Sequence, residues 1–242
     1  MNPMFGELRH FGDLLTRNAH LYRDRPGFAQ PAGEGDPEIE LDPAERTWGT
    51  IDARVRRLAR ALRRRGLRQG DRVAILGDNS AAWVEAFFAL ARCGMVAVPI
   101  GTGLSGGEVA GILEDCGATG LWVDDERLEL ARGAAGGAPD LHFVGGLGRA
   151  GGDVASLPEL LTEGEGAGAE LERPVADDDL CLLLYTSGTT GFPKGVMYTH
   201  RRMLVGTLIH VLAIGSARRH RVLLPAPLYS AAGVAGIACA GA

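Results

Sequence analysis

Short apolar segments alternate with segments of helical period through the first 145 residues, and this alternation constrains the fold more than any other feature of the sequence. The apolar segments predict strands over 72–76, 95–100, 121–123 and 141–144. Parallel strands need a long crossover between them, usually a helix. The alternation therefore predicts an α/β fold in which helices flank mainly parallel sheets and the crossovers are right-handed.

Residues typical of helix ends support the helices that lie between these strands. We predict helices over 8–20, 51–65, 83–91 and 108–116. Thr50 is the predicted N-cap of the second helix, which Gly66 terminates. Ser105 and Glu108 form a predicted capping box before the fourth helix.

The helix predicted over 51–65 is rich in arginine. Its arginines are Arg54, Arg56, Arg57, Arg60, Arg63, Arg64 and Arg65. One interpretation is a face that binds nucleic acid or an anionic membrane. The other is a solvated face opposite a core stripe. The second is preferred because the chain has a net charge of −5 and no aromatic residues interleave with the arginines. We expect no nucleic-acid partner.

Composition argues against several other classes. Four cysteines lie far apart and form no C-x-x-C pair, and six histidines do not cluster, so no metal site is predicted from them. A reducing compartment, the cytoplasm, is the simplest expectation. No apolar core of signal-peptide length occurs near the N-terminus. Residues 222–242 carry no charge, but prolines and glycines there favour a strand, a loop and a buried helix start over a transmembrane segment.

A glycine-rich segment separates two apolar runs, 182–185 and 196–198, which we predict to be buried strands. Between them, ten residues hold three glycines, four hydroxyl side chains and Lys194. Glycines let backbone N–H groups approach an anion, and lysine is a common partner of phosphate. This composition indicates a loop that binds polyphosphate, although a flexible, solvent-exposed hairpin is the alternative. The spacing matches neither the Walker A loop nor the dinucleotide fingerprint.

The string YTSGTTGFPKGV, from Tyr185 to Val196, resembles the signature loop of the adenylate-forming superfamily, which contains acyl-CoA synthetases, adenylation domains of peptide synthetases and luciferases. The resemblance implies that this loop holds the β- and γ-phosphates of ATP, and that the Thr186 hydroxyl is the best local candidate to contact Mg²⁺. The phosphate-binding residues it implies are Thr186, Ser187, Gly188, Thr189, Thr190, Gly191 and Lys194.

The resemblance also implies a reaction in two steps. A carboxylate attacks the α-phosphate of ATP and gives an acyl-adenylate and pyrophosphate. A thiol of coenzyme A or of a carrier protein then takes the acyl group. The substrate carboxylate is itself the nucleophile, so no catalytic side chain is identified in these residues.

After the glycine-rich segment, we predict a helix over 201–213 and a strand over 221–224. Leu204, Leu208, Val211 and Leu212 are predicted to face inward. The segment 225–234 then resembles the start of the family's acyl-binding wall, in which an aromatic residue is often followed by His. Tyr229 fits the aromatic, Ser230 replaces the His, and Gly233 completes the predicted pocket residues. A buried strand end and turn is the alternative.

Substrate class follows from charge near this segment. From His220 onward the chain holds no Asp or Glu that could pair with the ammonium of an amino acid, and an unpaired buried ammonium is costly. A fatty or aryl acid is therefore favoured. The loop Gly101-Thr102-Gly103 also departs from the Asn-Pro that the family usually carries.

We divide the chain into a first α/β subdomain (1–145), a glycine-rich connection (146–176) and a phosphate-loop unit (177–242). Residues 133–168 contain eleven glycines and are predicted to be a loose surface region with one short helix near 158–162. The adenine, ribose and C-terminal lysine segments of the family are absent, so we expect an N-terminal part of a ligase with poor solubility in isolation. The alternatives are a non-catalytic remnant or nucleotide-binding module, and a peptide-synthetase adenylation domain. The acid and the oligomeric state stay open.

Overall fold

The computed structural model describes residues 8–28, 46–149, 151–166, 174–186, 193–215 and 222–241. Its strands are β1 (Arg72–Leu76), β2 (Val96–Ile100), β3 (Gly120–Val123), β4 (Phe143–Gly146), β5 (Leu180–Thr186) and β6 (Lys194–Thr199). Its helices are α1 (Asp13–Leu21), α2 (Trp48–Arg64), α3 (Ala81–Arg92), α4 (Gly106–Asp115), the short 3₁₀ helix η1 (Asp125–Arg127), α5 (Leu128–Ala135), α6 (Leu157–Glu163), α7 (His200–Ile214) and α8 (Ala231–Gly241).

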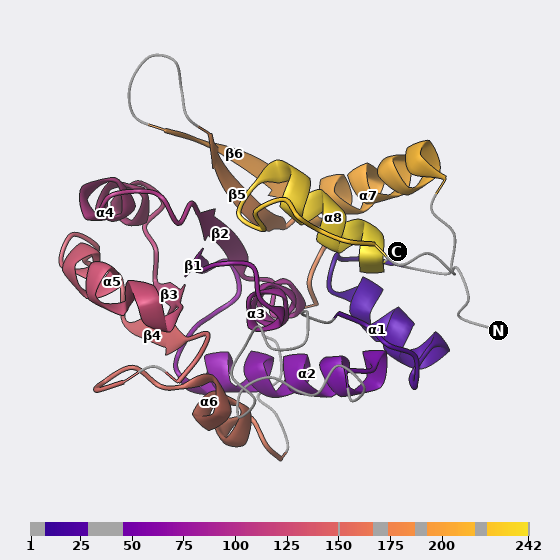
Figure 1. The fold of residues 1–242 in the computed structure, drawn as a ribbon, viewed down its shortest axis with the longest axis horizontal. Helices are drawn as coiled ribbons and strands as arrows, with labels where there is room; N and C mark the ends of the chain where they lie inside the picture. The colour runs from indigo at the N-terminus through magenta and orange to yellow at the C-terminus, as the bar shows by residue number, and fades with distance from the viewer. Residues whose placement is uncertain are drawn as a thin grey trace.

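The strands form one six-stranded sheet in the order β4-β3-β1-β2-β5-β6. All neighbours are parallel except β5 and β6, which form an antiparallel hairpin at one edge (Figure 1). The predicted α/β class with a mainly parallel sheet is therefore confirmed. The hairpin joins the rest of the sheet through β2, where Ala97 lies opposite Leu182.

Two hydrophobic clusters cover the two faces of this sheet. In β1, Val73 and Ile75 belong to the cluster that contains α1, α2 and α3, whereas Ala74 and Leu76 belong to the cluster that contains α4 and α5. This alternation follows from the two-residue period of a strand, which sends successive side chains to opposite faces. The result is a sheet between two helical layers (Figure 1).

Two of the three predicted helix-end signals are confirmed, and the third is off by three residues. The Ser105 side chain accepts from the Glu108 N–H, and the Glu108 carboxylate accepts from the Ser105 N–H, so the predicted capping box is confirmed. Gly66 follows α2 with φ of 90°. The N-cap of α2 was predicted wrongly, because Thr47 is the cap and its hydroxyl accepts from the N–H of Thr50, which lies inside the helix.

The arginine-rich face of α2 is less solvated than predicted, because α6 and the residues after it lie against it. The Arg60 Nε donates to the carbonyl of Gly164 at 2.5 Å, and Arg64 donates to the carbonyls of Glu163 and Glu165. Arg65 also pairs with the Glu163 carboxylate. Cations at the C-terminal end of a helix satisfy its free carbonyls and its dipole. These arginines therefore hold α6 in place.

Over residues 133–149 and 151–166, the chain is more regular than the predicted loose surface. This part of the chain contains β4 and α6, and α6 begins with a capping box formed by Ser156 and Glu159. Leu157, Leu160 and Leu161 are buried in the cluster that includes α2. The predicted short helix is confirmed, and its apolar side anchors the glycine-rich chain to the domain.

Replacing Gly164 by Ala is expected to lower the free energy of unfolding by about 2 kcal/mol, because overpacking against rigid backbone is costly. A Cβ at Gly164 would lie 1.9 Å from the carbonyl oxygen of Arg57, so α6 would have to move away from α2. Gly133→Ala is the matched control, since its Cβ would meet nothing within 4 Å. Urea denaturation of both variants tests this expectation, and equal midpoints would contradict it.

Two predictions about the last third of the chain are wrong, and a third is wrong in part. The strand β6 is mostly exposed rather than buried, because it lies at the edge of the sheet. Residues 222–224 form no strand. The buried residues of α7 are His200, Met203 and Thr207; of the predicted leucines, Leu204 packs against the cluster that contains α1, α2 and α3, whereas Leu208 and Leu212 are 60% and 72% exposed.

Candidate functional site

The candidate site lies along the side of the sheet that is formed by the carboxyl ends of the parallel strands, which we call the carboxyl edge. β1, β2 and β5 run in one direction, so their carboxyl ends meet at the same edge. In open α/β sheets this edge is the usual place for ligands. Thr186 is the last residue of β5, and the chain returns to the sheet at Lys194, the first residue of β6.

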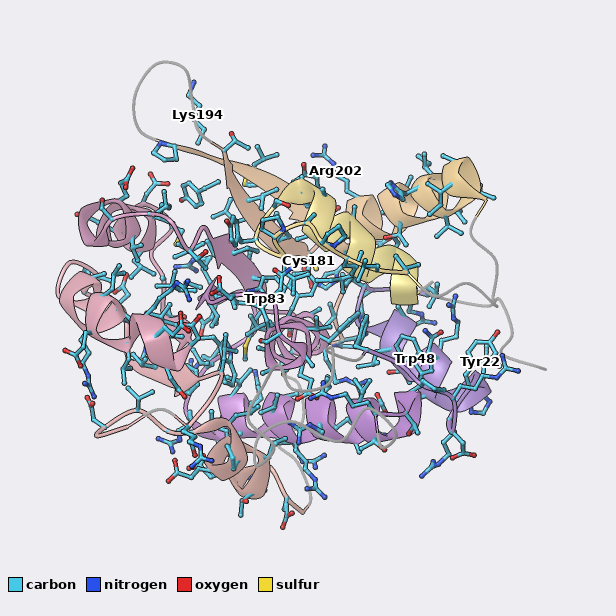
Figure 2. All side chains as sticks on the ribbon, viewed as in Figure 1. Tyr22, Trp48, Trp83, Cys181, Lys194 and Arg202 are labelled. Atoms are coloured by element: carbon cyan, nitrogen blue, oxygen red, sulfur yellow. The ribbon has the colours of Figure 1, made fainter. Side chains whose placement is uncertain are left out.

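The ends of the predicted phosphate loop are brought together by the hairpin. Thr186 lies opposite Lys194, and both residues are exposed. Figure 2 shows Lys194 at the outer end of the hairpin, far from Trp83 of α3. The other predicted phosphate-binding residues lie outside the described residues; they are Ser187, Gly188, Thr189, Thr190 and Gly191.

Lys194 has a property that composition alone could have revealed. It is the only lysine in the sequence, although lysine and arginine together number 25. A lysine ammonium is a compact, mobile point charge, whereas the planar guanidinium of arginine favours fixed two-point contacts. The one side chain with an ammonium group is therefore the one at the end of the candidate phosphate loop.

The residues beside this loop are tightly packed. A Cβ at Gly195 would lie 2.8 Å from the Leu183 side chain, so glycine permits the close approach of the two strands. The Tyr185 hydroxyl donates to the carboxylate of Asp115 at the end of α4. Burial, together with this hydrogen bond, raises the pKa of Tyr185. Sequence reasoning missed Asp115, which is 70 residues away from Tyr185.

A cavity of about 300 Å³ lies next to this tyrosine. Residues from β5, β6 and the C-terminal end of α4 line it, including Tyr185, Met197, Asp115 and Cys116. Burial raises the pKa of the Cys116 thiol to about 11, so this cysteine is neutral at physiological pH. The cavity is therefore a small, mixed pocket without a reactive thiolate.

The segment that contains Tyr229 lies at the same edge as the hairpin. The Asn79 side chain, just after β1, donates to the carbonyl of Ala226 at 2.9 Å and accepts from the N–H of Leu228 at 2.7 Å. A Cβ at Gly101, just after β2, would lie 3.6 Å from the Tyr229 ring. Asn79 was not predicted as a site residue, because its partners are about 150 residues away in the sequence.

Ser230 and Gly233 have a clear structural role at the start of α8. The Ser230 hydroxyl donates to the carbonyl of Pro227 at 2.7 Å and accepts from the N–H of Gly233 at 3.1 Å, as an N-cap serine does. A Cβ at Gly233 would lie 2.1 Å from the Pro227 carbonyl oxygen. The turn that this segment forms is thus fixed by backbone contacts, and its role as an acyl-pocket wall stays a prediction.

The described residues show neither a metal cluster nor a membrane-spanning helix. They contain no group of three or more His, Cys, Asp or Glu residues placed to hold a metal ion. No helix in the described part of the chain is long and apolar enough to cross a membrane. The described cysteines, Cys93, Cys116 and Cys181, are free thiols.

Comparison with known proteins identifies the family of this chain. The model of the family described as "AMP-binding enzyme" matches residues 17–242. Feruloyl-CoA synthase from Amycolatopsis sp. is 36% identical over 193 residues, which are 80% of this chain and 36% of that protein. The long-chain-fatty-acid–CoA ligase FadD13 from Mycobacterium tuberculosis is 33% identical over 236 residues, covering 93% of this chain and 42% of that ligase.

A solved structure agrees with these relatives. The inhibitor-bound N-terminal domain of FACL13 from Mycobacterium tuberculosis superposes with a TM-score of 0.80 at 29% identity, covering 96% of this chain and 55% of that one. The chain spans 36% to 42% of the length of the two curated relatives described above. These relatives are acid–thiol ligases, and the present sequence corresponds to their N-terminal portion. The chain therefore belongs to the AMP-binding enzyme family, in which it is similar to acyl-CoA ligases.

Proposed function

We propose that this chain is the N-terminal part of a ligase that activates a fatty or aryl carboxylic acid with ATP and transfers the acyl group to coenzyme A. The observation that carries the proposal is the hairpin β5–β6, which sets Thr186 and Lys194 opposite each other at the carboxyl edge of the sheet. In a family of AMP-binding enzymes, a glycine-rich turn at this edge suits the polyphosphate of the substrate ATP. Of the parts into which we divided the chain, residues 177–242 would carry the phosphate loop and residues 1–145 would form the rest of the sheet that supports it.

The reaction needs charge stabilisation more than proton transfer. A carboxylate oxygen of the acid attacks the α-phosphorus of ATP, and the bond to pyrophosphate breaks. The sulfur of the thiol then attacks the acyl carbon and AMP leaves. The Lys194 ammonium would neutralise the charge that grows on the pyrophosphate, and the Thr186 hydroxyl would orient its oxygens.

A magnesium ion would be held here mainly by the phosphates of the substrate and only to a small extent by the protein. The described residues offer no acidic cluster for the ion. Mg²⁺ keeps several waters and is usually bound by substrate phosphates with one or two protein oxygens. The exposed Thr186 hydroxyl is one such oxygen. When bound, the ion would supply additional positive charge next to the phosphates.

The substrate class is supported by charge and by the relatives. Feruloyl-CoA synthase and the long-chain-fatty-acid–CoA ligase are named for an aryl acid and a fatty acid. No Asp or Glu follows His220 in this sequence, so a substrate ammonium would have no carboxylate partner there. Coenzyme A is the thiol we propose, and the free cysteines are consistent with the cytoplasm.

Substituting Lys194 with Ala is expected to weaken ATP binding by about tenfold, because a charge-assisted contact to phosphate is lost. Isothermal titration of the 242-residue chain with ATP and Mg²⁺ measures this effect. Arg202→Ala is the matched control, since it removes an exposed positive charge at the other end of the hairpin.

Because Lys194 is the only lysine, an amine-reactive reagent labels this side chain and the N-terminal amine alone. ATP should slow the labelling of Lys194 without affecting the N-terminus. Equal ATP affinity of the Lys194→Ala variant, or labelling unaffected by ATP, would count against the proposed phosphate site. Acyl-AMP formation by the whole ligase from an amino acid, with none from fatty or aryl acids, would overturn the proposed substrate class.

A further inference from the structure

His200 is a buried histidine that the proposed reaction does not use. It is the first residue of α7 and follows β6 directly, so one strand of six residues connects it with Lys194. Its side chain is fully buried. At about 3.3 Å per residue, the strand places His200 and Lys194 roughly 20 Å apart, at opposite ends of the hairpin.

The imidazole of His200 links two distant parts of the chain. The backbone N–H of Phe11 donates to its Nδ1 at 3.0 Å, across 189 residues of sequence. Phe11 itself is fully buried, and its ring stacks on Phe88 of α3 at 5.5 Å. The acceptor on His200 therefore ties the end of β6 to the centre of the first hydrophobic cluster.

Other contacts at this end of the hairpin join it to the segment before β5, through backbone hydrogen bonds and through the pair of the Arg201 side chain with Asp177. The N–H of His200 donates to the carbonyl of Asp179, and the N–H of Arg201 donates to the carbonyl of Asp177. These bonds join the end of β6 to the start of β5 but do not attach either strand to the rest of the domain. Among the strands that the structure describes, β6 pairs with β5 alone. Tyr198 of β6 and Met203 of α7 pack against the first hydrophobic cluster, and the side chain of His200 adds a directional hydrogen bond to this apolar packing.

The ring can serve as an acceptor only while it is neutral. Since Nδ1 accepts from Phe11, the proton of the neutral ring is on Nε2, which has no hydrogen-bond partner among the described residues. The His10 ring lies edge-on at 5.7 Å, and Asp13, Asp179 and, through His10, Arg92 are the charged groups that act on this pair. Burial, and the nearby His10, lower the pKa of His200 to about 4, against the weaker opposing effect of the two aspartates.

We propose that His200 is a positioning residue that fixes the base of the phosphate-loop hairpin to the backbone of Phe11 and so sets the placement of Lys194 at the other end. This inference rests on the proposed function for its effect on ATP, but the attachment itself can be tested without ATP. It assigns a role in nucleotide binding to a residue that touches no nucleotide.

The attachment predicts a pH dependence with a definite sign. The pKa of His200 in the folded chain is below its ordinary value of 6.5, so the unfolded state takes up the proton more readily. The stability that the neutral ring contributes is fully present above pH 6.5 and is lost as the pH falls toward about 4. In proton NMR, the ring of His200 should titrate near pH 4, and a titration near pH 6.5 would overturn the inference.

Two variants test the attachment. His200→Phe keeps a ring but removes the acceptor, whereas His200→Asn keeps an acceptor close to the position of Nδ1. We expect the Phe11 amide to exchange at least about tenfold faster in the Phe variant than in the wild type, with the Asn variant between them. Lys194→Ala is the control, because it should leave Phe11 exchange unchanged.

ATP binding is the functional readout of the same variants. His200→Phe should weaken ATP binding by about fivefold, a size typical of coupling between distant sites, while His200→Asn should recover most of the affinity. Unchanged Phe11 exchange, or faster exchange with unchanged affinity, would overturn the proposal. If the wild-type chain binds no ATP, the proposed function fails separately, and faster exchange of the β6 amides in His200→Phe would still support the attachment, whereas unchanged exchange would refute it.

Discussion

Replacing Asp52 by Ala is expected to lower the free energy of unfolding by about 3 kcal/mol, because it removes a buried carboxylate and leaves the guanidinium of Arg92, which is only 20% exposed, without its partner. Asp52 lies on α2 and is 1% exposed. Its carboxylate pairs with Arg56 one turn along the same helix and with Arg92 at the end of α3. Arg92 also donates to the Thr16 hydroxyl of α1 at 2.8 Å, so the carboxylate connects three helices.

The measurement for Asp52 is urea denaturation at neutral pH. Glu129→Ala is the matched control, because the Glu129 carboxylate also pairs with an arginine, Arg132, but is 85% exposed, and such surface pairs contribute about 0–1 kcal/mol. Asp52→Asn should have a smaller effect than Asp52→Ala, since the amide oxygen can still accept from Arg92. If Asp52→Ala and Glu129→Ala shift the midpoint equally, the network does not stabilise the fold as we argue.

The partners of the charged residues on α2 could not be predicted from the sequence. Helical period correctly placed the apolar stripe, but it gave no information about elements that are distant along the chain. Arg54 pairs with Glu85 of α3, 31 residues away, and Arg65 pairs with Glu163, 98 residues away. A charged face that helical period predicts to be solvated is therefore partly covered by other helices.

Local signals explain the elements that were predicted well. The strand over residues 72–76 and the capping box of Ser105 and Glu108 depend on side chains within a few residues of each other. α7 shows the opposite case, because its own apolar residues are distributed around all sides of the helix. Such a helix has no single apolar stripe, so its sequence cannot specify which side is buried. Only packing shows that Met203 faces inward while Leu208 faces out.

In the candidate site, too, features encoded by neighbouring residues were predicted, whereas contacts between distant residues were not. The hairpin was predicted because its glycines, hydroxyls and Lys194 are consecutive. The contacts of Asn79 with Leu228 and of His200 with Phe11 join residues more than 140 positions apart. They depend on the order of strands in the sheet, which the alternation of strands and helices does not determine.

The double variant Leu208→Glu/Leu212→Lys is expected to convert the isolated chain from a mixture of assemblies into a monomer. Five large apolar side chains on α7 are more than half exposed; they are Val205, Leu208, Ile209, Leu212 and Ile214. Contiguous apolar surface of this kind promotes association. The new pair keeps the net charge unchanged, and Glu placed four residues before Lys supports the helix.

Size-exclusion chromatography with light scattering measures the change, and the free energy of unfolding should stay within about 0.5 kcal/mol, as for most surface substitutions. Met203→Lys is the opposing control on the same helix. Its side chain is 8% exposed, so the new charge should destabilise the chain without making it monomeric. A wild-type chain that is already monodisperse and unfolds cooperatively would refute this prediction, because it would show that the exposed face of α7 does not drive association.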